Sequence, residues 1–206
     1  MKKKLFSILL IIFCILLVGC SFDKEEEKKY TINENQELVE PIINWKEVTN
    51  YGKGSNVLVM EVQNINNRSI DFGLTATYYL KGEKVGKSTT ITYNSLKTEE
   101  KGLIWHNYQV PNCDQIEVTF DYIREAIYPD VEYKVLKNEK THNIVKTKLE
   151  INGQYTRGQT AVVFYYGRKI INVTIHNFLS DNPNDNYYEH DALKQFDRYT
   201  LYTNVY

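Results

Sequence analysis

The stretch "SIDFGLTATYYL", Ser69 to Leu80, decides the fold class because its apolar residues recur at every second position. One face takes Ile70, Phe72, Leu74, Ala76, Tyr78 and Leu80, and the other takes Asp71, Gly73, Thr75, Thr77 and Tyr79. A period of two is that of a β-strand with one face buried. The stretch therefore predicts a half-buried strand lying on an apolar core.

Three neighbouring stretches share this richness in β-branched and aromatic residues. They are "NVLVMEVQN" (56–64), "STTITYNSL" (88–96) and "QIEVTFDYI" (115–123). The joins "NINNRS", "LKGEKVGK" and "VPNCD" hold the Asn, Gly, Pro and Asp residues that reverse a chain. Short strands separated by such turns are typical of antiparallel sandwiches and barrels. We expect an all-β protein.

The chain also contains a weak internal repeat. "NVLVMEVQNINNRSIDFGLTATYYLKGEKVG" (56–86) parallels "NIVKTKLEINGQYTRGQTAVVFYYGRKII" (143–171), with Asn64 matching Asn152 and each tyrosine pair leading into a turn with Gly and Lys. Chance similarity among β-hairpins is the alternative. Duplication predicts two small β-sandwich domains, 41–127 and 128–206, joined near Tyr128-Pro129-Asp130.

The N-terminus has the build of an export signal. Three lysines, Lys2 to Lys4, precede about fourteen mostly apolar residues from Leu5 to Val18. This run is short for a membrane span, which needs roughly 20 apolar residues, although a permanent N-terminal helix is the alternative. Leu17-Val18-Gly19-Cys20 resembles the lipobox of bacterial lipoproteins. The resemblance implies that residues 1–19 are a signal peptide and that Cys20 carries the lipid.

A charged segment follows the cysteine. Residues 20–40 are polar with hardly any apolar periodicity, which predicts a flexible tether; a short helix in "DKEEEKK" is the alternative. Two acyl chains on Cys20 would give the stable anchoring that one chain does not. We expect a protein attached to the lipid bilayer at the cell membrane and facing the extracytoplasmic side.

Charge and cysteine content limit the partners. Loss of the leader removes three lysines and leaves 22 basic against 26 acidic residues, a net charge of about −4. A chain of this charge without basic patches is not a nucleic-acid binder. Cys14 leaves with the leader and Cys20 is expected to be lipidated, so Cys113 is the one remaining thiol and no internal disulfide forms. We interpret Cys113 as a structural residue in a turn.

The repeated motifs resemble the small immunoglobulin-like lipoprotein domains of bacteria, including the FxLYD type. The elements that carry the resemblance are Asn64 and Asn152, the pairs Tyr78-Tyr79 and Tyr165-Tyr166, and the turns Gly82–Val85 and Gly167–Ile170. The Asp that follows the aromatic residue in the FxLYD type is replaced here by Leu80 and Gly167. The resemblance implies tandem immunoglobulin-like sandwiches, export, a lipid anchor, and adhesion or scaffolding without catalytic residues.

Catalytic and metal-binding motifs are missing from the sequence. The histidines at 106, 142, 176 and 190 lack the spacing of a zinc site, and no nucleophile elbow or phosphate-binding glycine loop is present. The loop "SDNPNDNYYEHD" (180–191) carries Asp181, Asp185, Glu189 and Asp191, yet it departs from the EF-hand pattern at Ala192. We expect no cofactor, no metal and no enzyme activity, and interpret this loop as solvated or as a recognition loop.

Aromatic residues supply the candidate binding surface. The chain has 17 tyrosines, which suit protein interfaces and sugar stacking but also serve as ordinary strand formers. We predict that Trp45, Tyr79, Trp105 and Tyr166 belong to a binding surface. The predicted function is a non-catalytic protein-interaction or scaffolding module that binds an envelope protein. The alternative is binding of cell-wall carbohydrate through exposed Tyr and Trp faces.

Overall fold

The structure is a computed structural model that describes residues 32, 37–49, 55–127, 131–180 and 187–206. The predicted signal peptide, Cys20, most of the tether and the predicted join at residues 128–130 lie outside these ranges. All regular elements within the ranges are β-strands joined in antiparallel sheets, which confirms the all-β prediction. In the same ranges, no helix has the length and apolar character needed to cross a bilayer.

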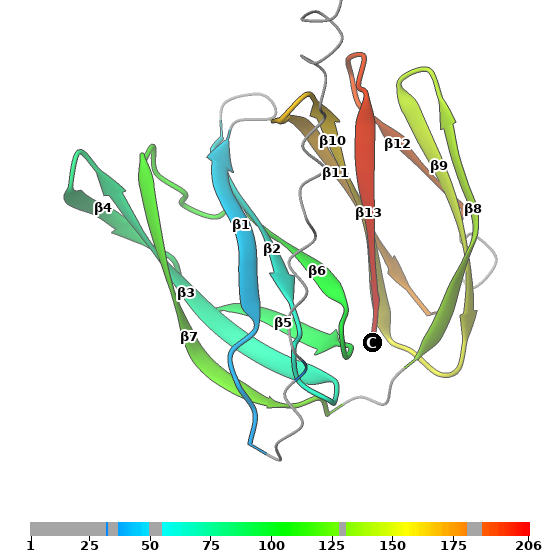
Figure 1. Ribbon diagram of the computed structural model, residues 1–206, viewed down its shortest axis with the longest axis horizontal. Helices are drawn as coiled ribbons and strands as arrows, with labels where there is room; N and C mark the ends of the chain where they lie inside the picture. Colours follow the sequence, from blue (N-terminus) through cyan, green and yellow to red (C-terminus); the bar gives the residue numbers. More distant parts are fainter. Residues whose placement is uncertain (1–31, 33–36, 50–54, 128–130, 181–186) are drawn as a thin grey trace, which may run out of the picture. The chain divides into compact units, whose positions relative to one another are not determined.

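The first half of the chain holds seven strands, coloured blue to green in Figure 1. They are β1 (Ile42–Thr49), β2 (Val57–Gln63), β3 (Ile70–Leu80), β4 (Glu83–Lys87), β5 (Ile91–Leu96), β6 (Lys101–His106) and β7 (Gln115–Glu125). One sheet has the order β1-β2-β6, and in the other β3 pairs with β4, β5 and β7. Their facing side chains form a core, here called the first core, that includes Met60, Phe72 and Tyr78. This half is a β-sandwich.

The second half holds six strands, coloured yellow-green to red in Figure 1. They are β8 (Glu132–Thr141), β9 (Ile144–Asn152), β10 (Arg157–Tyr166), β11 (Lys169–Leu179), β12 (Tyr187–Asp191) and β13 (Arg198–Val205). The sheets β12-β9-β8 and β11-β10-β13 enclose a second core that includes Val145, Phe164 and Phe196. This half is also a sandwich of two sheets.

A third cluster of apolar side chains joins the two halves. Val57, Val59 and Leu103 from β2 and β6 pack against residues of β10, β11 and β13, among them Val163 and Tyr202. We call this cluster the joining core. Strand β2 thus contributes to the first core and to the joining core on opposite faces, which explains why Val57 to Val62 are all buried. Residues 32–206 accordingly form one compact unit.

The two halves repeat one pairing scheme. The order β1-β2-β6 matches β8-β9-β12, and β3 between β4 and β7 matches β10 between β11 and β13. Among the described strands, pairing never crosses from one half to the other. The scheme agrees with an internal duplication, while the immunoglobulin-like assignment and the domain limits 41–127 and 128–206 stay predictions.

A repeated aspartate fixes the hairpin turn in each half. The main-chain nitrogen of Asp114 donates to Tyr79 O (2.9 Å), and Asp114 Oδ2 accepts from Lys81 N (2.9 Å). Asp197 does the same in the second half, with its nitrogen on Tyr165 O (3.0 Å) and its Oδ2 accepting from Gly167 N (2.6 Å). Tyr79 is therefore the structural counterpart of Tyr165, one position away from the pairing that the sequence comparison predicts.

Strand β3 follows its predicted alternation on one face only. Ile70, Phe72, Leu74, Ala76 and Tyr78 are fully buried in the first core, as predicted, whereas Leu80 is half-buried. On the other face Asp71 and Thr75 are buried too. Neighbouring strands cover them, because Asp121 of β7 accepts hydrogen bonds from Thr75 Oγ1 and Arg124 of the same strand lies 3.4 Å from Asp71.

Candidate interaction surface

The first sandwich is incompletely covered along the margin formed by β1 and β7. Strand β7 pairs with β3 over its whole length, and no described strand pairs with its other side (Figure 1). None of the eleven residues of β7 is buried. We call this margin, with its inward side chains from β1 and β7, the open edge.

The apolar lining of the open edge comes from both strands. Ile43 and Val48 of β1 and Ile116, Val118, Phe120 and Ile123 of β7 all pack against the first core and stay partly exposed. The other partly buried apolar residues of this core are Leu38, Val110 and Cys113. The residues that β5 and β6 contribute to the first core are, in contrast, fully or nearly buried. Incomplete burial is thus concentrated at one edge.

Acidic side chains line the outward face of β7. Glu117 Oε2 accepts a hydrogen bond from Tyr79 Oη (2.8 Å), and Asp121 Oδ2 accepts from Thr75 Oγ1 (2.8 Å) and Thr90 Oγ1 (2.9 Å). Within the described part of the chain, no Lys, Arg or His side chain lies within ion-pair distance of Glu117 or Asp121. The open edge therefore combines apolar inward residues with a negatively charged outward row.

Cys113 lies at one end of the open edge, directly before β7. It is partly exposed and is the only free thiol in the described ranges. Burial raises the pKa of its thiol, and the neighbouring Asp114 carboxylate raises it further. A thiol with a raised pKa is a poor nucleophile at neutral pH. This agrees with the interpretation of Cys113 as a structural residue, and it gives the edge a chemical reporter.

The four predicted surface residues do not meet on one face. Trp45 of β1 and Trp105 of β6 both pack against the joining core, partly buried on strands that flank β2. Tyr79 is half-buried on β3, bonded to Glu117. Tyr166 is 61% exposed at the end of β10. Cys20, the predicted lipid attachment residue, lies outside the described residues. Of the four, Tyr79 contacts β7 of the open edge, through Glu117, and Trp45 lies on β1 but packs against the joining core.

A buried carboxylate in the joining core was not predicted from the sequence. Glu61 of β2 is 7% exposed, accepts a hydrogen bond from Asn44 Nδ2 (2.7 Å) and accepts another from the Tyr202 hydroxyl. Burial raises the pKa of Tyr202 well above its ordinary value, and the Glu61 charge raises it further. Tyr202 thus stays protonated and works as a donor. The pair is a polar link between the two sandwiches.

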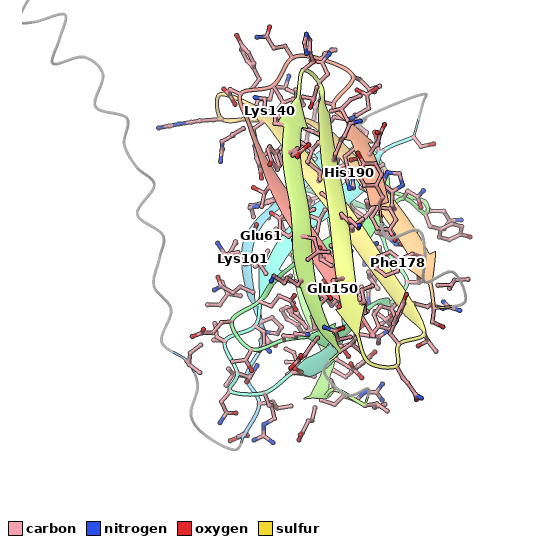
Figure 2. All side chains as sticks on the ribbon, turned by 90° about the vertical axis from the view of Figure 1, so that its right-hand side faces the viewer. Glu61, Lys101, Lys140, Glu150, Phe178 and His190 are labelled. Atoms are coloured by element: carbon pink, nitrogen blue, oxygen red, sulfur yellow. The ribbon has the colours of Figure 1, made fainter. Side chains whose placement is uncertain are left out.

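A row of aromatic rings lies along the β11 and β12 side of the second sandwich. Phe178 stacks on Tyr188 with ring centroids 5.4 Å apart, and His176 lies 5.7 Å from Tyr188 and 4.8 Å from His190. In Figure 2 the labels of Phe178 and His190 fall on the same side of β9. His176, Phe178 and Tyr188 are partly buried and His190 is buried, whereas the neighbouring Tyr187 is 39% exposed.

His190 is the buried end of this row. Its side chain is fully buried, Nδ1 lies 2.8 Å from Thr174 Oγ1, and Nε2 has no hydrogen-bond partner among the described residues. Burial lowers the pKa of His190 to about 3, with a further contribution from the nearby His176. The imidazole is therefore neutral at pH 7.

In the described ranges, no group of three or more His, Cys, Asp or Glu side chains is arranged to hold a metal ion. Asp181 and Asp185 of the acidic loop lie outside these ranges. Glu189 and Asp191 belong to β12, where Glu189 pairs with Lys146 at 2.7 Å and Asp191 Oδ1 accepts from Leu193 N at 2.7 Å. No protein-family model matches the chain, and no curated protein matches it in sequence.

Proposed function

We propose that the protein is a lipid-anchored extracytoplasmic lipoprotein that works as a non-catalytic protein-interaction module. The observation that carries the proposal is the open edge, where apolar side chains of β1 and β7 stay partly exposed beside the unpaired outer side of β7. Exposed apolar surface of this kind is typical of interaction sites. An unpaired strand edge also attracts other polypeptides.

The anchor is supported by the sequence alone. A basic start, an apolar run and the Leu17–Cys20 quartet precede the charged segment. The test compares the full chain with Cys20→Ser in cells given labelled palmitate. The proposal predicts that the wild-type chain is labelled and sediments with membranes, and that the variant is unlabelled and loses membrane retention. A labelled variant, or equal membrane retention of both chains, would contradict the anchor.

The interaction function is tested by capture on the fragment 21–206, which keeps all described strands. The fragment is immobilised through its N-terminus and exposed to solubilised envelope proteins, alongside Val118→Lys at the open edge and Val85→Lys on β4 as a matched control. Val85 is 41% exposed, and its strand β4 pairs with the side of β3 opposite to β7. We expect saturable protein binding that Val118→Lys abolishes and Val85→Lys retains. Equal binding by all three would contradict the open edge as the site.

The aromatic row on β11 and β12 favours a second candidate function, cell-wall carbohydrate binding. Tyr187 is 39% exposed and directly precedes Tyr188 on β12, whose ring stacks on Phe178, and aromatic faces are common sugar contacts. The same immobilised fragment is exposed to purified wall glycan. Retention that is lost in Tyr187→Ala and kept in Val118→Lys would replace the protein-interaction proposal with this one. The protein-interaction proposal predicts that the immobilised fragment does not retain wall glycan.

A further inference from the structure

The outer side of β7 has the backbone groups needed to bind another strand. In an antiparallel pair the hydrogen bonds of a strand alternate between its two sides, so alternate amides and carbonyls of β7 point away from β3. Strand β13 is the counterpart of β7 in the second half, and other parts of the chain cover its last residues. Tyr202 to Val205 are buried, and Tyr133 Oη donates a hydrogen bond to Thr203 O at 3.0 Å. The β7 edge has no such cover from the described chain.

Side-chain burial at β7 is the kind that an added strand would complete. Ile116, Val118, Phe120 and Ile123 pack against the first core but stay partly exposed, as do Ile43 and Val48 of β1. A strand placed beside β7 points every second side chain towards the same core. Apolar side chains at those positions would cover the exposed parts of Val118 and Phe120.

The charges on β7 decide what kind of strand fits. Glu117 and Asp121, four positions apart, project outwards without a described cation beside them, whereas the other two charged residues of β7 are paired, Arg124 with Asp71 and Glu125 with Arg68. Antiparallel pairing of two β7 strands around Thr119 would place Glu117 of each copy opposite Asp121 of the other. Like charges directly opposite each other destabilise a sheet. A second copy is therefore disfavoured, and a strand with Lys or Arg at its outward positions is favoured.

We infer that the outer edge of β7 binds an extended segment of a partner protein as an added β-strand, with apolar residues facing the first core and basic residues facing outwards. This inference rests on the proposed interaction function. Main-chain hydrogen bonds to β7 supply affinity in this binding mode, and the alternating side chains supply specificity.

The test uses synthetic peptides as probes on the fragment 21–206. One peptide has the length of β7 and alternates valine with lysine, and its control carries glutamate in place of lysine. Binding is measured by titration, amide hydrogen exchange and the alkylation rate of Cys113. We expect the lysine peptide to slow exchange of the outward amides of β7, to slow alkylation of Cys113, and to bind roughly ten-fold more tightly than the glutamate peptide.

A charge reversal supplies the matched variant. Glu117→Lys on β7 should weaken binding of the lysine peptide and strengthen binding of the glutamate peptide, whereas Glu83→Lys on β4 should change neither. Glu117 is exposed and makes one hydrogen bond to Tyr79, so folding is retained in this variant.

Three results would overturn the inference: no binding of the lysine peptide at millimolar concentration, equal binding of the two peptides, or protection of amides on another strand. The proposed function is judged separately. Suppose that the wild-type fragment captures an envelope protein, that Val118→Lys does not, and that the bound protein leaves the β7 amides unprotected. This result would support the interaction function and refute strand addition. If the wild-type fragment captures no envelope protein, the interaction function itself is refuted.

Discussion

The Tyr202 hydroxyl donates a hydrogen bond to Glu61 Oε2 across the joining core, between residues 141 positions apart in the chain. The two residues come from different halves, Glu61 from β2 and Tyr202 from β13. No described strand of one half pairs with a strand of the other. Side-chain links of this kind, and the apolar contacts around them, therefore hold the two sandwiches together.

We predict that Tyr202→Phe destabilises the protein by about 1–3 kcal/mol, because it leaves one oxygen of a buried carboxylate without its donor. Tyr166→Phe, at an exposed position, should change the free energy of unfolding little. Urea unfolding of the fragment 21–206 measures both. Adding Glu61→Leu to Tyr202→Phe should recover part of the loss, since no buried charge then remains. A Tyr202→Phe variant as stable as the wild type would contradict the link.

His190 should make the stability depend on pH below neutrality. Its folded pKa of about 3 lies below the ordinary value of 6.5, so the unfolded chain binds a proton that the folded chain rejects. The contribution of the neutral His190 to the free energy of unfolding is fully present above pH 6.5 and falls as the pH drops towards 3. Between pH 7 and pH 5 the loss is about 2 kcal/mol.

The check is the difference in unfolding free energy between the wild type and His190→Gln at several pH values. The variant should lose this part of the acid sensitivity, while His142→Asn at an exposed turn should keep it. Parallel pH profiles for the wild type and His190→Gln would show that His190 is not the residue responsible.

Cys113 should react slowly with alkylating reagents in the folded protein. Burial and the Asp114 carboxylate raise its pKa, so less thiolate is present at pH 8 than in an exposed cysteine. We expect alkylation several-fold slower than in the urea-unfolded chain and accelerating as the pH is raised. Equal rates in the folded and unfolded chains would mean that Cys113 is not packed against the first core.

Gly158 gives a test of the aromatic row. A Cβ atom at this position of β10 would lie 2.1 Å from Phe178 Cε2, so Gly158→Ala must displace the Phe178 ring. We expect a loss of about 1–3 kcal/mol on unfolding and a change in near-ultraviolet circular dichroism as the Phe178–Tyr188 stack shifts. In Gly86→Ala the nearest atom, Pro111 Cγ, is 3.1 Å away, so a smaller effect is expected there. Equal effects would argue against the ring contact.

Local patterns in the sequence predicted the strands well. The alternation in residues 69–80 identified β3 and its core-facing side. The repeat predicted the matching hairpins, although Asp114 and Asp197 place the correspondence one residue away. These features depend on residues close together in the chain.

Long-range contacts explain what the sequence did not predict. Trp45 and Trp105 were predicted to belong to a binding surface because they are tryptophans. They lie instead on the two strands that pair with β2 and pack against the joining core. Glu61 has the alternation of an outward residue but meets Tyr202 from a strand at the other end of the chain. The alternation of β7 resembles that of β3, and only sheet topology distinguishes an edge strand from a central one. The one local feature of the sequence that marks this edge is the pair of acidic residues Glu117 and Asp121.

The most direct test of the open edge is photo-crosslinking in cells from Thr119 on β7, with Thr92 on β5 as the control. Both threonines are exposed and lie on strands that pair with opposite sides of β3. The proposal predicts that a photoreactive residue at position 119 crosslinks to a distinct envelope protein and that position 92 does not. Equal crosslinking from both positions, or none from position 119, would contradict the open edge as the interaction site.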